Sequence, residues 1–237
     1  MDNLIMSDEH TPLPRHIGFI LDGHRRWAKE HNIPLLEGHR QGYKNFKKIG
    51  LAALDRGVEV VSAYVWSKEN WQRSAEEVSY IMRLLLWVAE HELEDIHKRG
   101  VRICFLGNDD KLDPKILKAI ANAEETTKDN RNGTLALCLN YSGQQEIVDA
   151  AKAIMQEGIP ADELTPDRFA EYLYTPDLPP VDLLIRSSGE QRISGFMLWR
   201  IAYAELMFVN KKWPDFTEQD LQDALDEYAG RQRRFGA

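Results

Sequence analysis

The sequence predicts a single α/β domain in which a six-stranded, mostly parallel sheet lies between two layers of helices. Short apolar runs with little charge alternate along the chain with longer segments whose apolar residues recur at helical spacing. No proline- or glycine-rich linker and no internal repeat divides the 237 residues. We expect a polar N-terminal tail at residues 1–15 and one domain at residues 16–237.

The composition is that of an ordinary globular protein and argues against several functional classes. The formal net charge of −8 disfavours a nucleic-acid binder that neutralises phosphates over a broad basic face. Cys104 and Cys138 lie in separate apolar runs without a CxxC spacing, which favours inert thiols in a reducing compartment. No stretch has the length of a signal peptide core or the ~20 apolar residues of a membrane span. We therefore expect a cytoplasmic protein without a membrane span, which still permits peripheral association with a membrane.

The six predicted strands are short runs rich in β-branched and other apolar residues. Strands that pair in parallel are covered on both faces, which is why they read as nearly continuous apolar runs. The predicted strands are IGFIL at residues 17–21, VEVVSAYVW at 58–66, VRICFL at 101–106, TLALCLN at 134–140, VDLLI at 181–185 and ELMFV at 205–209.

The predicted helices alternate with these strands and start at recognisable caps. Ser74 with Glu77 forms a capping box for one long helix that we expect to reach Lys98. Asp113 followed by Pro114 is typical of a helix start. Further helices are expected at about 37–56, 145–156 and 166–172, and a final helix after Thr217.

The apolar stripe of the helix expected at 74–98 is wider than one helical face. Leu84, Leu86, Trp87 and Val88 extend it beyond the positions that one neighbour covers. A second packing neighbour explains such a helix most simply, whereas an apolar tunnel or groove is the alternative that carries a function.

Polar side chains gather directly after four of the predicted strands. A single Asp-Gly pair such as Asp22-Gly23 most often forms an ordinary turn, so no cluster alone indicates a site. The carboxyl ends of parallel strands lie at one edge of the sheet, however, and all four clusters should converge there. Their arginines, hydroxyls and glycines predict a site for two phosphate-like groups, with Asp22 and Glu205 as ligands for Mg²⁺. The clusters are residues 22–27, 67–73, 140–143 and 186–194.

Other phosphate-handling and hydrolytic enzymes are disfavoured by the motifs that the chain lacks. It has no GxxxxGK[ST], no GxGxxG after the first strand, no HExxH and no GxSxG. Residues 109–113 read DDKLD and match the DDxxD metal motif of the all-helical trans-prenyl transferases. That motif works as a facing pair on long helices, whereas this single copy lies where a strand passes into a helix and acidic residues serve as caps.

Several longer motifs occur in a fixed order between His16 and Gly236, and in this order they resemble the cis-prenyl transferases of the undecaprenyl diphosphate synthase type. The resemblance implies a dimeric, mostly parallel α/β sheet with a hydrophobic tunnel, for which residues 84–88 are candidate walls. The motifs are residues 16–27 with DG and RW, Gly38-His39, Ser67 with 69–71 and Arg73, LNY at 139–141 with Gly143, DLLIRSSGEQRIS at 182–194, and the segment from Trp199 to WPDF at 213–216.

The resemblance also implies roles for individual residues. Asp22 becomes the essential acid and Mg²⁺ ligand, Asn70 assists proton transfer and Glu205 contributes to the metal site. Residues 234–236 are expected to reach the site of a neighbouring subunit. The substrate-binding residues that the resemblance implies are Gly23, His24, Arg25, Arg26, Trp27 and His39 for the allylic diphosphate, Ser67, Lys68, Glu69, Trp71 and Arg73 for ordering both substrates, and Arg186, Arg192, Ile193 and Ser194 for isopentenyl diphosphate.

The implied activity is Mg²⁺-dependent condensation of isopentenyl diphosphate onto an allylic primer, expected to be farnesyl diphosphate, by a homodimer. A long polyprenyl diphosphate such as undecaprenyl diphosphate is the first expected product, and it should partition into membranes. A short- or medium-chain cis-prenyl diphosphate synthase is the alternative enzyme, and a non-catalytic partner subunit of the same fold is the third reading. A scaffold has no need for converging anion ligands, so the joint retention of these residues argues against the third reading: Asp22, Asn70, Arg186, Arg192 and Ser194.

The chain departs from the family pattern at several positions, which we expect to affect primer choice and chain length rather than the reaction class. Leu35 stands where an arginine is expected, and Arg25 is expected to replace that charge. The other departures are His24 and Arg25 in place of Asn and Gly, Val65 in place of a frequent alanine beside the tunnel, Gln191 in place of a histidine, and Gly195 in place of an asparagine.

Overall fold

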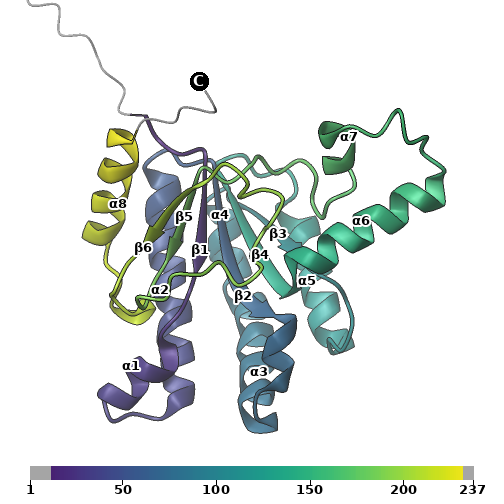
Figure 1. Cartoon of the computed structure of the whole chain (residues 1–237). Coiled ribbons are helices and arrows are strands. Elements are labelled where there is room, and N and C mark those ends of the chain that lie inside the picture. The colour runs from purple at the N-terminus through teal and green to yellow at the C-terminus, as the bar shows by residue number, and fades with distance from the viewer. Residues whose placement is uncertain (1–11, 232–237) are drawn as a thin grey trace, which may run out of the picture.

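Six parallel strands form one sheet at the centre of the molecule (Figure 1). The computed structural model describes residues 12–231. The order across the sheet is β3-β4-β2-β1-β5-β6, and every pair of neighbours is parallel. All six predicted strands are confirmed. Their bounds are β1 His16–Ile20, β2 Val60–Ser67, β3 Arg102–Leu106, β4 Thr134–Tyr141, β5 Leu183–Arg186 and β6 Glu205–Phe208.

The helices of the described segment connect these strands and start close to the predicted caps. Asp113 accepts a hydrogen bond from the Lys115 N–H, and Thr217 accepts one from the Asp220 N–H. The α-helices are α1 His24–Glu30, α2 Leu35–Asp55, α3 Ala75–His91, α4 Leu93–Lys98, α5 Pro114–Thr127, α6 Gly143–Glu157, α7 Pro166–Ala170 and α8 Glu218–Gly230, with 3₁₀ helices η1 Lys68–Gln72 and η2 Trp213–Asp215.

The long helix predicted over residues 74–98 is wrong as one element, because the structure divides it into α3 and α4. The helix breaks at Glu92, which has φ −103° and ψ −11°. Lys47 Nζ on α2 lies 2.5 Å from the Glu92 carboxylate and 2.8 Å from that of Asp95, so the ion pairs draw the start of α4 toward α2. No glycine or proline marks the break, so it depends on this tertiary contact.

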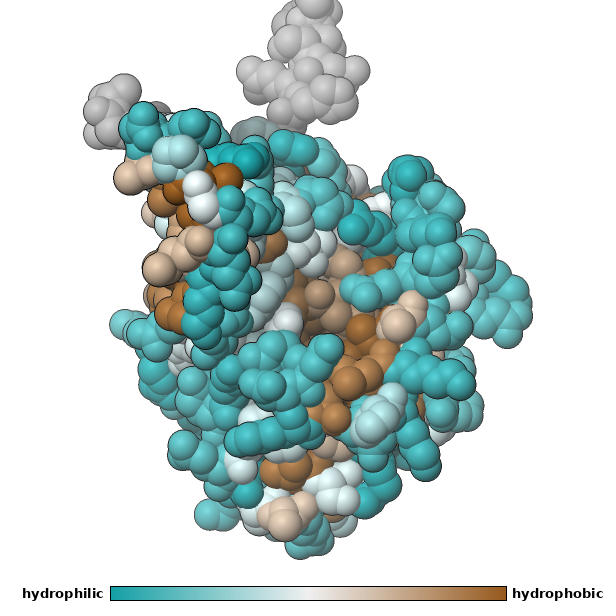
Figure 2. All heavy atoms as spheres, turned by 90° about the vertical axis from the view of Figure 1, so that its right-hand side faces the viewer, coloured by the Kyte–Doolittle hydropathy of each residue, from teal (hydrophilic) through white to brown (hydrophobic). Residues whose placement is uncertain are grey.

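The side chains of each strand alternate between two apolar layers. Ile17 of β1 belongs to the layer that α2 and α8 cover, and Ile20 belongs to the opposite layer, which packs against residues 174–204. Cys104 and Cys138 are buried in the second layer, where burial raises the pKa of the Cys104 thiol to about 12. Figure 2 views the molecule from the side on which α6 lies and shows apolar surface gathered in a strip between polar margins.

A buried ion pair fastens α6 to the segment that covers the second layer. Arg200 Nη1 lies 2.7 Å from Glu146 Oε1, and the two side chains are 4% and 1% exposed. The Tyr141 hydroxyl donates to the other Glu146 oxygen at 2.5 Å. Arg200 Nη2 donates to the carbonyls of Tyr174 at 2.5 Å and Thr175 at 3.1 Å. Thr175 has φ +49°, which is strained for a β-branched residue, and the ion pair holds it there.

His16 at the start of β1 is fully buried and neutral. Its Nδ1–H donates to the Pro179 carbonyl at 2.9 Å, and its Nε2 accepts from the Ser62 hydroxyl at 2.9 Å. A charged imidazole in this place would lose the hydration that it has in the unfolded chain. Burial therefore lowers the pKa of His16 to about 4, from about 6.5 in an unfolded chain.

Acidification is expected to destabilise the fold in part through His16. Between pH 6.5 and pH 4 the unfolded chain binds a proton here that the folded protein does not, so the free energy of unfolding falls as the pH drops. Going from about pH 7 to pH 5 removes about 2 kcal/mol through this residue. Urea unfolding of the wild type and of His16→Gln at both pH values measures this term. Between pH 7 and pH 5 the free energy of unfolding of His16→Gln is expected to fall by about 2 kcal/mol less than that of the wild type. An equal fall in both proteins contradicts the lowered pKa of His16.

Candidate active site

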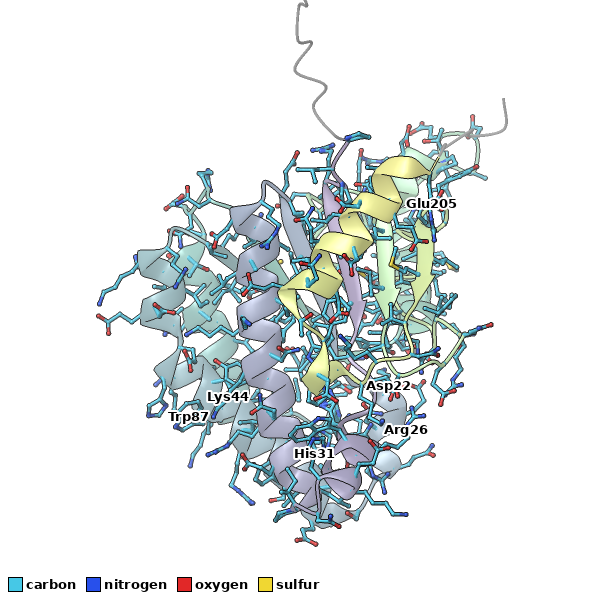
Figure 3. All side chains as sticks on the ribbon, turned by 90° about the vertical axis from the view of Figure 1, so that its left-hand side faces the viewer. Asp22, Arg26, His31, Lys44, Trp87 and Glu205 are labelled. Atoms are coloured by element: carbon cyan, nitrogen blue, oxygen red, sulfur yellow. The ribbon has the colours of Figure 1, made fainter. Side chains whose placement is uncertain are left out.

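The crevice between the carboxyl ends of β1 and β5 holds the candidate active site. After β1 the chain continues to β2 on one side of the crevice, and after β5 it continues to β6 on the other side. The crevice is therefore a topological switch point, where open parallel sheets bind ligands. Asp22 follows β1, and Arg186 ends β5. Arg186 Nη2 lies 2.9 Å from Asp22 Oδ2. Figure 3 shows Asp22 and Arg26 close together at this edge of the sheet.

The backbone turn that carries Asp22 is held by distant segments. The Asp22 N–H donates to Ser187 Oγ at 2.9 Å, and the Asp22 carbonyl accepts from the Ser187 hydroxyl and the Trp213 N–H, each at 2.9 Å. The Gly23 N–H donates to Asp22 Oδ1 at 2.6 Å, and Gly23 has φ +102°, a left-handed backbone that favours glycine. Ser187 was missed as a site residue, although its place in the polar loop after β5 was an available signal.

Arginines from α1 and from the loop after β5 surround this carboxylate. The buried Arg186 donates through Nη1 to Ser194 Oγ at 2.8 Å and to the Arg192 carbonyl at 2.5 Å, while its buried Nε–H has no partner among the described residues. Arg26 and Arg192 both pair with Glu190, at 3.2 Å and 2.6 Å. Glu190 was also missed as a site residue, because ion pairs between residues of different loops cannot be predicted from the sequence. A free guanidinium N–H beside two further arginines suits a phosphate group.

Two histidines and an ion pair form the side of the site next to α2. The rings of His24 and His39 stack with centroids 5.2 Å apart, and His39 Nε2 lies 3.1 Å from Glu77 Oε1, which also pairs with Arg73 at 2.9 Å. Burial lowers the pKa of His24 to about 3, and burial with the Arg73 cation lowers the pKa of His39. His24 Nε2 donates to the Leu21 carbonyl at 3.0 Å, and Nδ1 is buried without a partner among the described residues.

The segment after β2, which contains η1, is fixed by side-chain hydrogen bonds. Asn70 Oδ1 accepts from the Ser67 N–H at 3.1 Å, and Trp71 Nε1–H donates to Asn140 Oδ1 at 2.7 Å. Asn140 is the penultimate residue of β4 and has φ +50°, and its amide donates to the Asn108 carbonyl at 2.9 Å. The predicted clusters after β2 and β4 therefore meet, and Asn140 ties both of them to the loop after β3.

An apolar cavity of about 930 Å³ extends from this polar mouth between the sheet and helices α2, α3, α4 and α5. Leu84, Leu85, Leu86 and Val88 of α3 line it, whereas Trp87 lies outside with 46% of its surface exposed (Figure 3). Ile81 is the one residue of α3 that is buried, and Leu85 and Leu86 both line the cavity and pack against the cluster that contains Ile81. The wide apolar stripe of this helix therefore serves the cavity.

Most of the predicted site residues lie around this cavity. Leu35 and Arg25 line it together, which fits the expected replacement of charge. Gly195 has φ +75°, a conformation that glycine and asparagine both adopt, so this departure leaves the backbone unchanged. The predicted residues that line the cavity are Asp22, Gly23, His24, Arg25, Arg26, His39, Ser67, Asn70, Arg73, Arg186, Arg192 and Ser194, whereas Trp27, Lys68, Glu69, Trp71, Ile193 and Glu205 do not.

Two of the residues outside the cavity lining hold the fold instead. Trp27 Nε1–H donates to Asp215 Oδ1 at 2.7 Å. Glu205 begins β6 and pairs with Arg231 at 2.9 Å, at the edge of the sheet opposite to Asp22 (Figure 3). One chain therefore does not bring Glu205 and Asp22 together, because parallel strands place their first and last residues at opposite ends, and the metal-site role of Glu205 stays a prediction.

The described residues, 12–231, contain no cluster of three or more histidine, cysteine, aspartate or glutamate side chains able to hold a metal ion. None of the helices in this range is long and apolar enough to cross a membrane. Residues 234–236, predicted to reach a neighbouring subunit, lie outside the described residues, as do residues 1–11 of the predicted tail.

Known proteins match the chain over nearly its whole length and confirm the resemblance drawn from its motifs. The prenyltransferase model that describes undecaprenyl diphosphate synthases matches residues 20–236. "Isoprenyl transferase 2" of Corynebacterium efficiens is 45% identical over 94% of each chain. The trans,polycis-polyprenyl diphosphate synthase ((2Z,6E)-farnesyl diphosphate specific) of Thermobifida fusca is 43% identical over 94% of this chain and 81% of its own.

A solved structure shares the fold as well. Lavandulyl diphosphate synthase from Lavandula x intermedia, solved in complex with dimethylallyl diphosphate, has a TM-score of 0.91 and 34% identity, covering 95% of this chain and 99% of its own. The chain therefore belongs to the undecaprenyl diphosphate synthase (isoprenyl transferase) family of cis-prenyl diphosphate synthases.

Proposed function

We propose that the protein condenses isopentenyl diphosphate with an allylic diphosphate, with farnesyl diphosphate as the primer, in repeated Mg²⁺-dependent cycles. The observation that carries the proposal is the direct passage from a cationic mouth around Asp22 into an apolar cavity of about 930 Å³. A diphosphate suits the mouth, and a growing hydrocarbon suits the cavity. The dimethylallyl diphosphate bound by the lavender enzyme is itself an allylic diphosphate.

Two diphosphate subsites are proposed, one on each side of Asp22. The allylic diphosphate lies against α1, where Gly23 offers a close backbone and Arg25 and Arg26 offer charge, with His39 beside them. Isopentenyl diphosphate lies against the loop after β5, where the Arg186 Nε–H lacks a partner within the described chain. The remaining proposed ligands are Arg192 and Ser194 for isopentenyl diphosphate, and Ser67, Asn70 and Arg73 between the two subsites.

The donor set at Asp22 fits Mg²⁺. This ion usually binds one or two carboxylates together with substrate phosphate oxygens, so a protein cage of several acids is unnecessary. The Asp22 oxygens accept the Gly23 N–H and the Arg186 guanidinium and keep further lone pairs for an ion. When bound, Mg²⁺ neutralises charge on the diphosphate that leaves.

The residues of this site supply positioning and electrostatic stabilisation. As the allylic carbon–oxygen bond breaks, negative charge develops on the leaving diphosphate, and the arginines and amides around Asp22 stabilise it. The isopentenyl double bond forms the new carbon–carbon bond, and loss of one proton leaves the cis alkene. Asn70 lines the cavity mouth and is proposed to assist this proton transfer. The leucines of α3 shield the cationic carbon from water.

A long polyprenyl diphosphate is the proposed product, because the cavity reaches from Asp22 to Ile116 on α5 and Leu135 on β4. Such a product is apolar enough to partition into membranes. A short- or medium-chain product is the second candidate. It is favoured by Val65, which lines the cavity wall and is bulkier than the alanine that often stands there.

We also propose that the protein is a homodimer. Strand β6 is at the edge of the sheet, and its Leu206 and the neighbouring Tyr203 are 40% and 73% exposed. Val148 and Met155 of α6 are 47% and 80% exposed, and apolar surface gathers in a strip on that side of the molecule (Figure 2). Exposed apolar patches of this kind mark protein interfaces.

An incorporation assay tests the proposed reaction. Purified protein is incubated with farnesyl or geranyl diphosphate, labelled isopentenyl diphosphate and Mg²⁺, and the chain lengths of the products are measured. We expect products with many added units, and a chelator is expected to abolish their formation. Products with one or a few added units support the second candidate. Failure to incorporate label with any allylic primer contradicts both.

A further inference from the structure

The turn that carries Asp22 is closed by the side chain of His24. Its Nε2 lies 3.0 Å from the carbonyl oxygen of Leu21, three residues earlier in the chain. A carbonyl oxygen only accepts hydrogen bonds, so Nε2 carries the proton and donates it, and the neutral ring leaves Nδ1 unprotonated. Nδ1 is buried without a partner among the described residues. The ring therefore acts on the backbone of the turn and presents no polar atom to a ligand.

The other polar backbone groups of this turn take their partners elsewhere. Ser187 and Trp213 bond the N–H and the carbonyl of Asp22, and the Asp22 carboxylate bonds the Gly23 N–H. The Leu21 carbonyl is the group that His24 satisfies. The bond to this partly buried carbonyl contributes roughly 0.5–1.5 kcal/mol, so His24 favours this turn over neighbouring conformations.

Helix α2 has room for this ring at one position. A Cβ at Gly42 would lie 2.2 Å from His24 Cε1 and 2.4 Å from its Nδ1, far inside any real contact. One helical turn earlier, a Cβ at Gly38 would lie 2.5 Å from the His24 carbonyl oxygen. The His39 ring stacks on the imidazole. Two glycines on one helical face and a stacked ring therefore fix the orientation in which Nε2 meets Leu21.

We propose that His24 is a positioning residue for Asp22. Its ring packs against Gly42 and holds the Leu21 carbonyl by a hydrogen bond. The backbone of the turn is thereby fixed, and with it the orientation of the Asp22 carboxylate after β1. The inference rests on the proposed role of Asp22 in prenyl transfer. It gives a function to a residue at which the chain departs from the family pattern. A misplacement of about 1 Å near reacting atoms can cost about 10²-fold in rate, so the effect is on kcat more than on KM.

Two substitutions of His24 separate the hydrogen bond from simple packing. His24→Leu keeps apolar volume above Gly42 but removes the donor, whereas His24→Gln keeps an N–H at similar reach. We expect His24→Leu to lower kcat about 10-fold with KM for isopentenyl diphosphate changed less than about twofold, and His24→Gln to restore most of kcat. An unchanged kcat in His24→Leu, or an equal loss in His24→Gln, overturns the proposal.

Gly42→Ala tests the same contact from α2, and Gly50→Ala on the same helix is its matched control. A Cβ at Gly50 would meet Leu135 at 3.4 Å, an ordinary contact. We expect Gly42→Ala to lower kcat as His24→Leu does and Gly50→Ala to leave it unchanged. In a His24→Ala background Gly42→Ala should cost little more, because the ring that it displaces is gone. Additive losses overturn the proposal.

Nitrogen NMR of protein labelled at histidine measures the protonation of the His24 ring and the exchange of its proton, independently of activity. The proposal predicts that His24 is protonated at Nε2 in the wild type and that this proton exchanges slowly with solvent. In Gly42→Ala the slow exchange of this proton should be lost. A His24 ring that exchanges freely in the wild type overturns it. If the wild-type protein turns over no substrate, the proposed function fails instead, and the NMR result still decides the geometry.

Discussion

Replacing Asp22 by asparagine is expected to lower the rate of prenyl transfer by at least about 10²-fold, the scale of losing one preorganised electrostatic contact. Asparagine keeps the size of the side chain and can still accept the Gly23 N–H, but it removes the charge that faces Arg186 across 2.9 Å. A neutral amide also replaces the carboxylate that Mg²⁺ prefers. Asp22→Ala should lose at least as much activity. Turnover of labelled isopentenyl diphosphate over a range of Mg²⁺ concentrations measures the loss.

The matched control for Asp22→Asn is Asp129→Asn. The Asp129 side chain is 85% exposed and its carboxylate lies 3.9 Å from Arg131, so its loss should leave turnover unchanged. Thermal unfolding of each variant separates a lost reaction from a lost fold. Turnover of Asp22→Asn within about threefold of the wild type, in a folded protein, contradicts the role proposed for this carboxylate.

Arg200→Met is expected to destabilise the fold by about 3–5 kcal/mol, the cost of leaving one member of a buried ion pair alone. Glu146 is 1% exposed and would keep a charge without its counterion. The carbonyls of Tyr174 and the strained Thr175 would also lose their donor. The free energy of unfolding, measured in urea by circular dichroism, reports this loss.

Two controls separate charge from volume in this prediction. The double variant with Arg200→Met and Glu146→Gln removes both charges and should recover most of the lost stability. Lys128→Met removes an exposed lysine that pairs with Glu125 at 2.5 Å, and it should change the free energy of unfolding by less than about 1 kcal/mol. A loss in Arg200→Met as small as that of Lys128→Met contradicts the prediction.

The strands and most helix starts could be predicted because their causes are local. Apolar runs with little charge mark strands that are covered on both faces, and Asp113 and Thr217 cap helices within three residues of themselves. The break between α3 and α4 could not be predicted in this way. It depends on Lys47, which lies far away in the sequence and pairs with Glu92 and Asp95.

The site could be predicted to the extent that the parallel sheet determines it. Because all parallel strands end on the same side of the sheet, the four clusters that follow them converge, and Asp22 meets Arg186 as expected. The same rule, applied to the amino end of β6, places Glu205 away from Asp22 within one chain. Ser187 and Glu190 lie in the predicted cluster at residues 186–194, but the hydrogen bonds of Ser187 and the ion pairs of Glu190 across loops could not be predicted from spacing.

The leucines of α3 also connect the filling of the cavity with the stability of the protein. This helix has one buried residue, Ile81, and its Leu84, Leu85, Leu86 and Val88 border an open cavity. A hydrocarbon that fills the cavity supplies the dispersion contacts which a packed core would otherwise supply. If the proposed reaction takes place, each addition fills more of this cavity, and bound product is expected to raise the free energy of unfolding.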